Sequence, residues 1–447
     1  MRKRRLPPQG EFTAEILDFD QEGRGFARID GKATFIADAL PGERVRFRYL
    51  HAGKDADEGQ CVAVEQASAD RVEPRCAHFG ICGGCSMQHL HPASQIAFKQ
   101  KQLLDQLERI GRLRPETIAP PVVADVEHGV WGYRRRARLG AKRVPKKGGA
   151  IVGFRERNTH FVTPLQRCEV LDPRIGEKLP ALRALIDGLS IPDRVPQVEV
   201  ACAADRVALV FRLLDPASED DLARLAAFGA EASFDIYLQT GGPATIRPLT
   251  PAAPLEYSPD GSGLRLRFEP ADFIQVNGSI SQQTVRQALD WLELSAGDRV
   301  LELFCGLGNF SLPLAARGAR VMAVEGEIGL VQRARENARR NGFDDPAALS
   351  FEKADLFKEG ADASWLQAPF DKVLLDPPRA GAREILPLVA ARAPFRIVYV
   401  SCHPGTLARD AGMLVHEHGY RLARAGVMDM FPHTSHVESM ALFVREA

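Results

Sequence analysis

The sequence has no net charge and no long apolar run. Its 58 Lys and Arg balance 58 Asp and Glu, so overall charge gives no argument for a polyanionic partner. No stretch of about 18 apolar residues is present, which argues against a membrane-spanning helix. The basic start, Arg2-Lys3-Arg4-Arg5, is followed by Pro7-Pro8 and polar residues where a secretory signal would be apolar. We therefore expect a cytoplasmic protein without a membrane partner.

Cysteine is scarce, with 8 residues in the chain. Thiols stay reduced in the cytoplasm, so these cysteines are considered as metal ligands, nucleophiles or core residues before disulfides. Hydrophobic residues at 45% and charged residues at 26% are ordinary for a globular protein. A chain of 447 residues usually divides into two or three domains.

Composition and periodicity divide the chain into three predicted domains. Short strands separated by turns predict a small antiparallel β-barrel of OB-like type in residues 1–68. Residues 69–270 begin with a segment rich in Cys, Gly and His, continue with an amphipathic helix from Pro92 to about Ile110, and then form an α+β region. Residues 271–447 alternate strands and helices regularly, which predicts a Rossmann-like α/β domain with a parallel sheet. The barrel strands are expected at 12–16, 25–29, 33–36, 43–50 and 60–64.

Positive charge gathers in the stretch from Arg134 to Arg157. The stretch contains Arg134, Arg135, Arg136, Arg138, Lys142, Arg143, Lys146, Lys147, Arg155 and Arg157. The only acid among them is Glu156, and Trp131, Tyr133 and Phe154 nearby are possible stacking groups. We interpret the stretch as a phosphate-binding surface, the alternative being an ordinary solvated charged face.

A glycine turn after the first strand of the C-terminal domain predicts a nucleoside site. The turn spans Leu303 to Asn309, and its two glycines let backbone approach a ligand closely. Glu325 lies about 20 residues downstream at the end of the next strand, where an acid binds ribose hydroxyls. The third glycine of a dinucleotide fold is missing, which favours a nucleoside without phosphates, such as S-adenosylmethionine. Asp355 is expected near the adenine or, with equal weight, as a helix N-cap.

Cys402 ends a buried strand at the edge of the sheet where ligands bind. A cysteine of this kind is commonly a small core residue, but polar Ser401 and His403 beside it favour a nucleophile. Addition of its thiolate to C6 of a uracil would make C5 nucleophilic enough to accept a methyl group. A base must then remove the C5 proton, and Glu438, just before the last strand, is the candidate. Asp376, in Asp376-Pro377-Pro378-Arg379, presents a further carboxylate at the same edge.

Cys76, Cys82 and Cys85 lie in a glycine-rich segment that can wrap around a metal centre. Cys168 is the best candidate for a fourth ligand. The spacing alone leaves a [4Fe-4S] cluster and a four-thiolate zinc site equally favoured. The remaining thiols, Cys61, Cys202 and Cys305, are expected in the core or in structural roles.

These motifs together resemble those of bacterial 23S rRNA uridine-C5 methyltransferases that carry a TRAM barrel and a [4Fe-4S] cluster. The resemblance extends from end to end of the chain. The matching strings are His78 to Cys85, Asp272 to Asn277, Leu303 to Phe310, Leu374 to Pro377, Ser401 to Pro404 and Asp429 to Thr434.

The resemblance implies a role for each matching residue. Cys402 would be the nucleophile, Glu438 the proton acceptor, and Phe273 would stack on a uracil flipped out of its RNA. Contacts to S-adenosylmethionine would fall to Gln275, Phe304, Asn309, Glu325, Asp355 and Asp376. The iron-sulfur cluster would be held by Cys76, Cys82, Cys85 and Cys168.

The resemblance also implies a substrate and an assembly state. The partner would be 23S rRNA, the activity that of a 23S rRNA (uracil(1939)-C(5))-methyltransferase, and the protein a monomer. Two residues depart from the family pattern, Pro378 where many members have Ala and His403 where many have Asn. Both touch the predicted pocket, although neither holds an assigned role.

Three other functions stay open at this point. The enzyme could methylate another rRNA or tRNA uridine. It could be an amino-group methyltransferase, because Asp376-Pro377-Pro378 is also similar to the motif of enzymes that methylate exocyclic nitrogens without a covalent intermediate. A non-catalytic iron-sulfur RNA-binding scaffold is a third possibility, and it would have no need of both Cys402 and Glu438.

Overall fold

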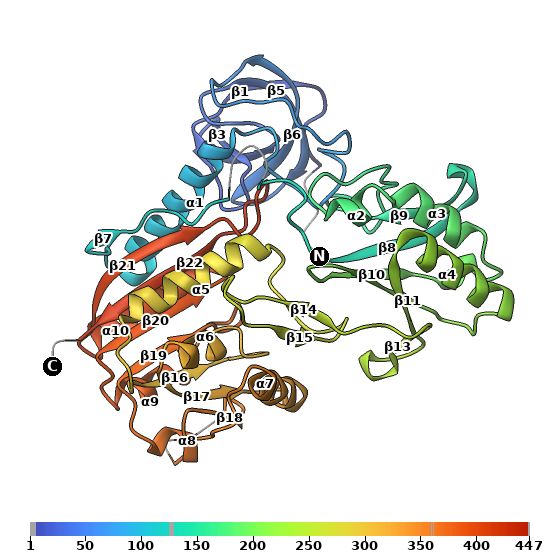
Figure 1. The fold of residues 1–447 in the computed structure, drawn as a ribbon. Coiled ribbons are helices and arrows are strands. Elements are labelled where there is room, and N and C mark those ends of the chain that lie inside the picture. The colour runs from blue at the N-terminus through green and yellow to red at the C-terminus, as the bar shows by residue number, and fades with distance from the viewer. Residues whose placement is uncertain (1–5, 125–128, 359, 361, 446–447) are drawn as a thin grey trace.

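The computed structural model describes residues 6–124, 129–358, 360 and 362–445. In Figure 1 the blue N-terminal sheet lies above two larger lobes, the green central lobe on one side and the yellow-to-red C-terminal lobe on the other. Within the described residues, no helix is both long and apolar enough to cross a membrane.

The N-terminal part is a curved sheet wrapped around its own small core. Its described strands run in the order β1 (Phe12–Glu15), β5 (Arg44–Ala52), β6 (Ala56–Gln66), β4 (Lys32–Ala37), β3 (Gly25–Ile29) and β2 (Asp18–Phe19). Ile36, Val45 and Phe47 are fully buried inside it. The five strands expected from the sequence are present, and β2 is an addition. The sheet is not wholly antiparallel, because β4 and β6 pair in parallel after the long β5–β6 hairpin.

Helix α1 (Pro92–Gln106) connects the N-terminal part to the C-terminal lobe. It continues into one π-helical turn, Leu107–Gly111, and the chain then reverses at Arg112, whose φ is 54°. A Cβ on Gly111 would lie 2.7 Å from the carbonyl oxygen of Ala408 in α10 (Pro404–His416), so the two helices approach closely at a glycine. The helix expected from Pro92 to about Ile110 is thus confirmed.

The central lobe is a mixed sheet covered by helices. Its strands run in the order β13 (Arg247–Pro248), β12 (Phe234–Gln239), β11 (Val207–Arg212), β10 (Gln197–Cys202), β8 (Arg136–Val144) and β9 (Gly149–Gly153). The helices are α2 (Pro173–Gly176), α3 (Leu179–Asp187) and α4 (Glu219–Ala232). Leu139, Leu182 and Phe211 lie in the core between the two layers. A two-stranded sheet, β14 (Leu255–Tyr257) and β15 (Leu266–Phe268), leads into the C-terminal lobe.

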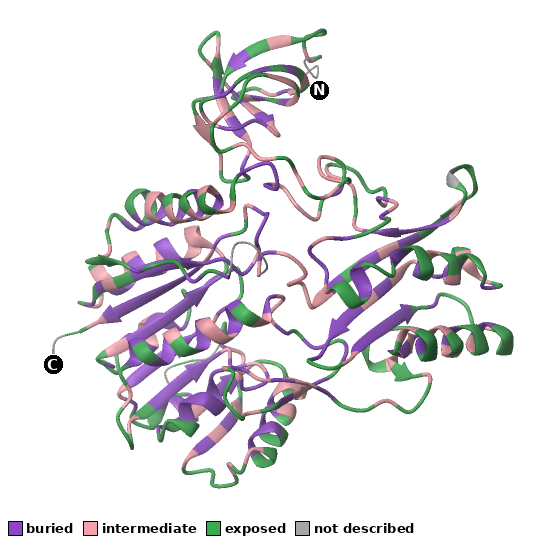
Figure 2. Ribbon diagram, turned by 45° about the horizontal axis from the view of Figure 1, so that its top comes forward, coloured by how far each residue is buried: buried purple, intermediate pink, exposed green. Residues whose placement is uncertain are grey.

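The C-terminal lobe is a sheet with helices on both faces (Figure 1). The strand order is β18 (Leu349–Lys353), β17 (Arg320–Glu325), β16 (Arg299–Leu303), β19 (Lys372–Leu375), β20 (Arg396–Ser401), β22 (Glu438–Val444), β21 (Arg421–Met428) and β7 (Thr117–Ile118). The helices in addition to α10 are α5 (Gly278–Leu292), α6 (Ser311–Ala316), α7 (Ile328–Arg340), α8 (Ser364–Gln367) and α9 (Leu386–Ala390). Figure 2 shows the strands of this lobe largely buried and the outer faces of its helices exposed.

The predicted parallel sheet holds for five neighbouring strands, from β18 to β20. The last pair differs, because β22 is antiparallel to both β20 and β21. The connection from β21 to β22 contains no helix, and a parallel pair would need a longer crossover. The carboxyl ends of the parallel strands therefore meet the start of β22.

Strand β7 joins the edge of this sheet from a distant part of the sequence. It pairs in parallel with β21, and the next residues continue the seam through hydrogen bonds from Val122 N to Val427 O (2.9 Å) and from Asp429 N to Val122 O (2.8 Å). The predicted boundaries 1–68, 69–270 and 271–447 remain predictions. Within the second of these ranges, α1 and β7 lie against the C-terminal sheet.

Candidate active site

A cavity of about 580 Å³ lies at the carboxyl ends of the parallel strands of the C-terminal sheet. All nine residues predicted for catalysis, cofactor binding and base stacking line it: Phe273, Gln275, Phe304, Asn309, Glu325, Asp355, Asp376, Cys402 and Glu438. They come from segments spread over more than half of the lobe, and the parallel topology brings them to one edge.

The glycine turn after β16 forms one wall of the cavity. Phe304 adopts a φ of 65°, and its amide donates to Val324 O at 2.9 Å. Gly306 and Gly308 follow at φ 55° and 91°, a region that favours glycine. A Cβ at Gly308 would meet Leu312 Cδ1 at 2.7 Å, whereas one at Gly306 would meet nothing within 4 Å. Gly308 is therefore required by the turn itself.

Hydrogen bonds hold Glu325 and Asn309 in fixed positions. The two carboxylate oxygens of Glu325 accept from Gly306 N and Glu327 N, each at 3.0 Å. Asn309 Oδ1 accepts from the hydroxyl of Tyr257 at 3.3 Å. Both side chains keep further hydrogen-bonding capacity for a ligand, because a carboxylate offers more than two acceptor sites and an amide offers donors as well.

Asp355 lines the cavity at a turn, and its expected place near the adenine stays a prediction. Its carboxylate also accepts from the backbone of Phe357 at 3.2 Å. The segment that it caps is a turn and not a helix. Lys358, at 2.7 Å, lowers the pKa of this carboxyl group, so Asp355 is ionised at neutral pH.

Cys402 and two carboxyl groups share one end of the cavity. Cys402 follows β20 directly and is exposed to the cavity. Partial burial of its thiol, together with the nearby Glu438 and Asp376, raises the pKa of the thiol to about 11. Burial, and to a lesser extent Asp376, raises the pKa of Glu438 to about 8. Burial also raises the pKa of Asp376 to about 7. Arg379 lowers the pKa of the Cys402 thiol, but its effect is outweighed by burial and by the two carboxyl groups.

The polar neighbours of Cys402 have a structural role. His403 is the N-cap of α10, where its Nδ1 accepts from Thr406 N at 3.2 Å. Ser401 Oγ accepts from His403 N at 3.1 Å. These bonds fix the backbone at the strand-to-helix turn and so point Cys402 into the cavity.

Phe273 is 72% exposed although it is a large aromatic residue at the cavity mouth. Gln275, which also lines the cavity, is anchored through its backbone oxygen, which accepts from Arg135 Nε at 2.7 Å. Arg135 also lies over the ring of Tyr257, at 4.7 Å from the centroid. Arg135 and Tyr257 were not predicted as site residues, because neither belongs to a motif that indicates this role. Tyr257 lines the cavity and Arg135 packs over its ring.

The basic stretch is divided in two by the fold. Arg135 supports Gln275, Arg136 binds Glu199 at 3.1 Å, and Arg157 binds Asp38 at 2.6 Å. The exposed cations are Arg138, Lys142, Arg143, Lys146 and Arg155. Among the described cations of this stretch, these five are exposed to solvent, so the phosphate surface predicted from the sequence is smaller than the stretch itself.

The aromatic residues beside the basic stretch are also engaged. Trp131 stacks on His433 with ring centroids 3.9 Å apart. The hydroxyl of Tyr133 donates to Pro432 O at 3.0 Å. These contacts limit how far the two rings can stack on bases. At the cavity itself, the exposed aromatic residues are Phe273 and Phe357.

The four cysteines predicted as metal ligands line one small pocket. Cys76, Cys82, Cys85 and Cys168 surround it together with apolar side chains. Burial and the neighbouring thiols raise the pKa of Cys85 to about 12. Across the described ranges, no group of three or more Cys, His or acidic side chains meets the spacing of a single metal ion. Of the other thiols, Cys202 and Cys305 are buried, as expected.

The chain is similar in sequence to known proteins over nearly its whole length. The family model described as tRNA (Uracil-5-)-methyltransferase matches residues 260–446. A 23S rRNA (uracil(1939)-C(5))-methyltransferase RlmD from Alkalilimnicola ehrlichii is 52% identical, over 100% of this chain and 99% of that protein. The protein of the same name from Acidithiobacillus ferrooxidans is 50% identical, over 96% of each chain.

A solved structure has the same fold. The crystal structure of Pyrococcus abyssi tRNA (uracil-54, C5)-methyltransferase in complex with S-adenosyl-L-homocysteine superposes with a TM-score of 0.73 at 24% sequence identity. The match covers 97% of this chain and 99% of that one.

Proposed function

Because the chain belongs to the family of RNA uracil-C5 methyltransferases, we propose that it methylates C5 of uracil 1939 in 23S rRNA with S-adenosylmethionine as the methyl donor. The observation that carries the proposal is the presence of Cys402, Glu438 and the nucleoside-type glycine turn in one cavity. The donor, when bound, supplies an electrophilic methyl group and a positive charge on sulfur.

Cys402 begins the reaction as a nucleophile. The thiol of Cys402, whose pKa of about 11 keeps it protonated in the free protein, first gives its proton to water, and the resulting thiolate adds to C6 of the uracil. The π electron pair of the C5–C6 bond moves into the ring carbonyl and forms an enolate. C5 then attacks the methyl group and forms the new carbon–carbon bond, while the donor keeps the electron pair of the broken bond. The ring is now saturated at C5 and C6 and is bonded to Cys402.

Glu438 completes the reaction as a base. Its carboxylate removes the proton from C5, the electron pair restores the C5–C6 double bond, and the bond from C6 to the cysteine sulfur breaks. The free thiolate is thereby regenerated. A pKa of about 8 suits this role, because a general base is most effective when its pKa lies near the working pH.

The donor would lie across the glycine turn. Glu325 would bind the ribose hydroxyls and Asp355 would lie near the adenine, since both follow strands at the ligand-binding edge. Gln275, Phe304, Asn309 and Asp376 would complete its contacts. Phe273 would stack on the flipped uracil, for which its exposure at the cavity mouth is the support.

The rest of the chain would bind the RNA. We assign residues 1–68 to a TRAM-type barrel, 69–270 to a central RNA-binding domain and 271–447 to the methyltransferase domain. The exposed cations Arg138 and Arg155 line a second cavity of about 950 Å³ between the first two parts, which supports a path for the phosphate backbone there. We expect a monomer that acts in the cytoplasm, where its ribosomal substrate is made.

A [4Fe-4S] cluster bound by Cys76, Cys82, Cys85 and Cys168 belongs to the same proposal. Four thiols facing one apolar pocket fit such a group, because a metal centre would stabilise the thiolates that burial disfavours. We expect iron and sulfide in equal amounts after anaerobic purification. Stoichiometric zinc in place of iron would instead indicate a four-thiolate zinc site.

RNA that contains 5-fluorouridine at the target position tests the reaction. Fluorine cannot leave C5 as a cation, so the enzyme should stall as a covalent protein–RNA adduct that survives denaturing electrophoresis. The adduct should be lost in Cys402→Ala and kept in Cys202→Ala, which removes a buried thiol of the central sheet. An enzyme that methylates an exocyclic nitrogen would form no adduct, and neither would a non-catalytic scaffold.

A further inference from the structure

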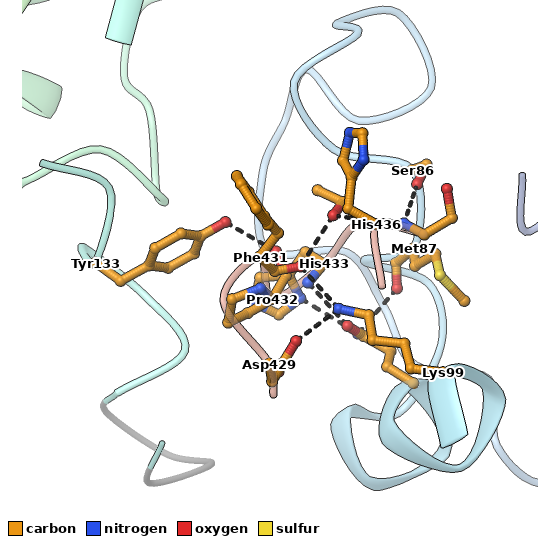
Figure 3. A network of polar contacts seen from close by, with 12 residues as sticks. Ser86, Met87, Lys99, Tyr133, Asp429, Phe431, Pro432, His433 and His436 are labelled. Carbon is orange, nitrogen blue, oxygen red and sulfur yellow. Dashed lines mark hydrogen bonds and ion pairs between the residues drawn. The ribbon is translucent and has the colours of Figure 1, made fainter. Parts of the chain in front are cut away.

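The segment from Asp429 to Val437 connects β21 to β22 and forms part of the cavity wall. Phe431 within it and Glu438 directly after it both line the cavity. Figure 3 shows that this segment lies between α1 and the loop before it on one side and the Tyr133 region on the other. The catalytic base is thus reached from β21 through a stretch without helix or strand, whose position must be set by its contacts.

Lys99 of α1 contacts this segment through a buried ion pair and a hydrogen bond. Its side chain is fully buried, and its Nζ donates to Asp429 Oδ1 at 2.6 Å and to Phe431 O at 2.9 Å (Figure 3). A buried ammonium group is strongly unfavourable without such partners. The pair therefore ties the segment to α1, and removing either partner leaves the other charge buried.

Neutral hydrogen bonds complete the attachment around His433. Its carbonyl oxygen accepts from Ser86 N and Met87 N, each at 2.9 Å, and its amide donates to Gln95 Oε1 at 2.8 Å. Lys99 is the only described residue among these contacts that also brings a full positive charge toward the cavity.

Glu438 faces charged groups from several elements. They are Asp376 after β19, Cys402 after β20 and Lys99 on α1. Further out, Arg379 acts on Cys402, and Arg134, Arg379 and Lys99 act on His436. Burial and Asp376 raise the pKa of Glu438, and Lys99 is the group that lowers it.

We propose that Lys99 is a positioning residue for the step that removes the C5 proton, because it holds the segment that leads directly into Glu438. The positive charge of Lys99 also acts on the Glu438 carboxylate. The inference rests on the proposed role of Glu438. A role of this kind affects only the second half of the reaction, removal of the C5 proton, because attack by Cys402 and methyl transfer come before the base is needed.

The first test divides those halves with Lys99→Met. Adduct formation with 5-fluorouridine RNA should stay close to that of the parent protein, because it does not need the base. Release of tritium from RNA carrying tritium at C5 should slow by about tenfold, since a misplaced base loses part of its usual contribution. Lys101→Met is the matched control, because Lys101 lies on the same helix but is half exposed and should change neither rate.

The second test uses the pH profile of tritium release. On the acid side the rate depends on ionised Glu438, so loss of the nearby positive charge in Lys99→Met should shift this limb to higher pH by about half a unit. Asp429→Asn breaks the same ion pair but keeps the ammonium group, and its acid limb should not move upward. A purely structural role predicts the same profile for both variants.

The outcomes are distinct. No adduct with the parent protein would refute the proposed function itself. If the parent protein forms the adduct and Lys99→Met matches it in tritium release and in pH profile, the role of Lys99 is refuted. An equal loss of adduct formation and tritium release in Lys99→Met would also refute it. If Lys99→Met does not fold, Lys99→Met/Asp429→Leu removes both buried charges and should fold, with the same upward shift of the acid limb. An unshifted limb in that double variant would also refute the proposal.

Discussion

Glu438 owes its chemistry to its place as the first residue of β22, at the cavity and beside Asp376. Glu438→Gln should leave Cys402 addition and methyl transfer intact but block removal of the C5 proton. The methylated covalent adduct on ordinary uridine RNA should then accumulate and be visible by intact-protein mass spectrometry. Free product formed at the parent rate would exclude Glu438 from the mechanism.

The pH dependence of the reaction follows from the same carboxyl group. Its pKa of about 8 in the free protein means that the carboxylate is scarce at pH 6 and dominant at pH 9. We expect the rate of tritium release from C5, the step that needs this base, to rise with pH through about 8 and to fall as the pH drops, because only the ionised carboxylate accepts a proton. An acid limb near the ordinary pKa of a glutamate would contradict the burial of this side chain.

Residues at strand ends could be predicted, and residues that act from a distance could not. Cys402, Glu325 and Asp376 follow apolar strands directly, so local periodicity places them at the ligand-binding edge. Lys99 and Arg135 reach the site through tertiary contacts, and their own sequence surroundings resemble a helix face and a charged surface. Burial of a charge depends on what packs over it, which no short window of sequence contains.

At the scale of elements, the turn between β16 and α6 depends on Gly308. Gly308→Ala should raise KM for S-adenosylmethionine by tenfold or more, because the left-handed backbone costs about 1 kcal/mol and the new Cβ would press on Leu312. Isothermal titration with S-adenosylhomocysteine would measure the loss. Gly297→Ala is the control, since Gly297 also has a positive φ but has open space around it and lies outside the cavity. It should cost stability without changing cofactor affinity.

The elements themselves were largely predictable. Periodicity indicated the five parallel strands and the helices α5, α6 and α7, because a buried strand is apolar on both faces and each helix buries one apolar stripe. Helices α8, α9 and α10 were not predicted. The order of the strands in the sheet was not predictable, because the insertion of β22 between β20 and β21 and the addition of β7 depend on pairing between segments far apart in the sequence. The π-helical turn after α1 also escaped prediction, because it depends on how closely α10 packs there.

At the scale of the whole molecule, Arg155 and Arg157 should separate RNA binding from domain attachment. Arg157 binds Asp38 of the N-terminal part and, at 2.8 Å, the carbonyl of Cys85, whereas Arg155 is exposed. Arg157→Met should lower the free energy of unfolding by about 2 kcal/mol, as measured by denaturant titration. Arg155→Met should leave stability unchanged and reduce the salt dependence of RNA binding by about one unit of slope. Equal effects of both variants on stability would contradict this division.

The edge strand β7 also constrains how the protein can be made. Its partner strand begins at Arg421, 305 residues after Glu116, which binds that arginine from the stretch just before β7. During synthesis, the early segment leaves the ribosome long before the sheet that receives it exists. It must wait, with its backbone groups satisfied by water or a chaperone, until nearly the last residues emerge. A separately expressed catalytic lobe starting at residue 271 would carry a bare outer strand, open to pairing with a second copy and to aggregation.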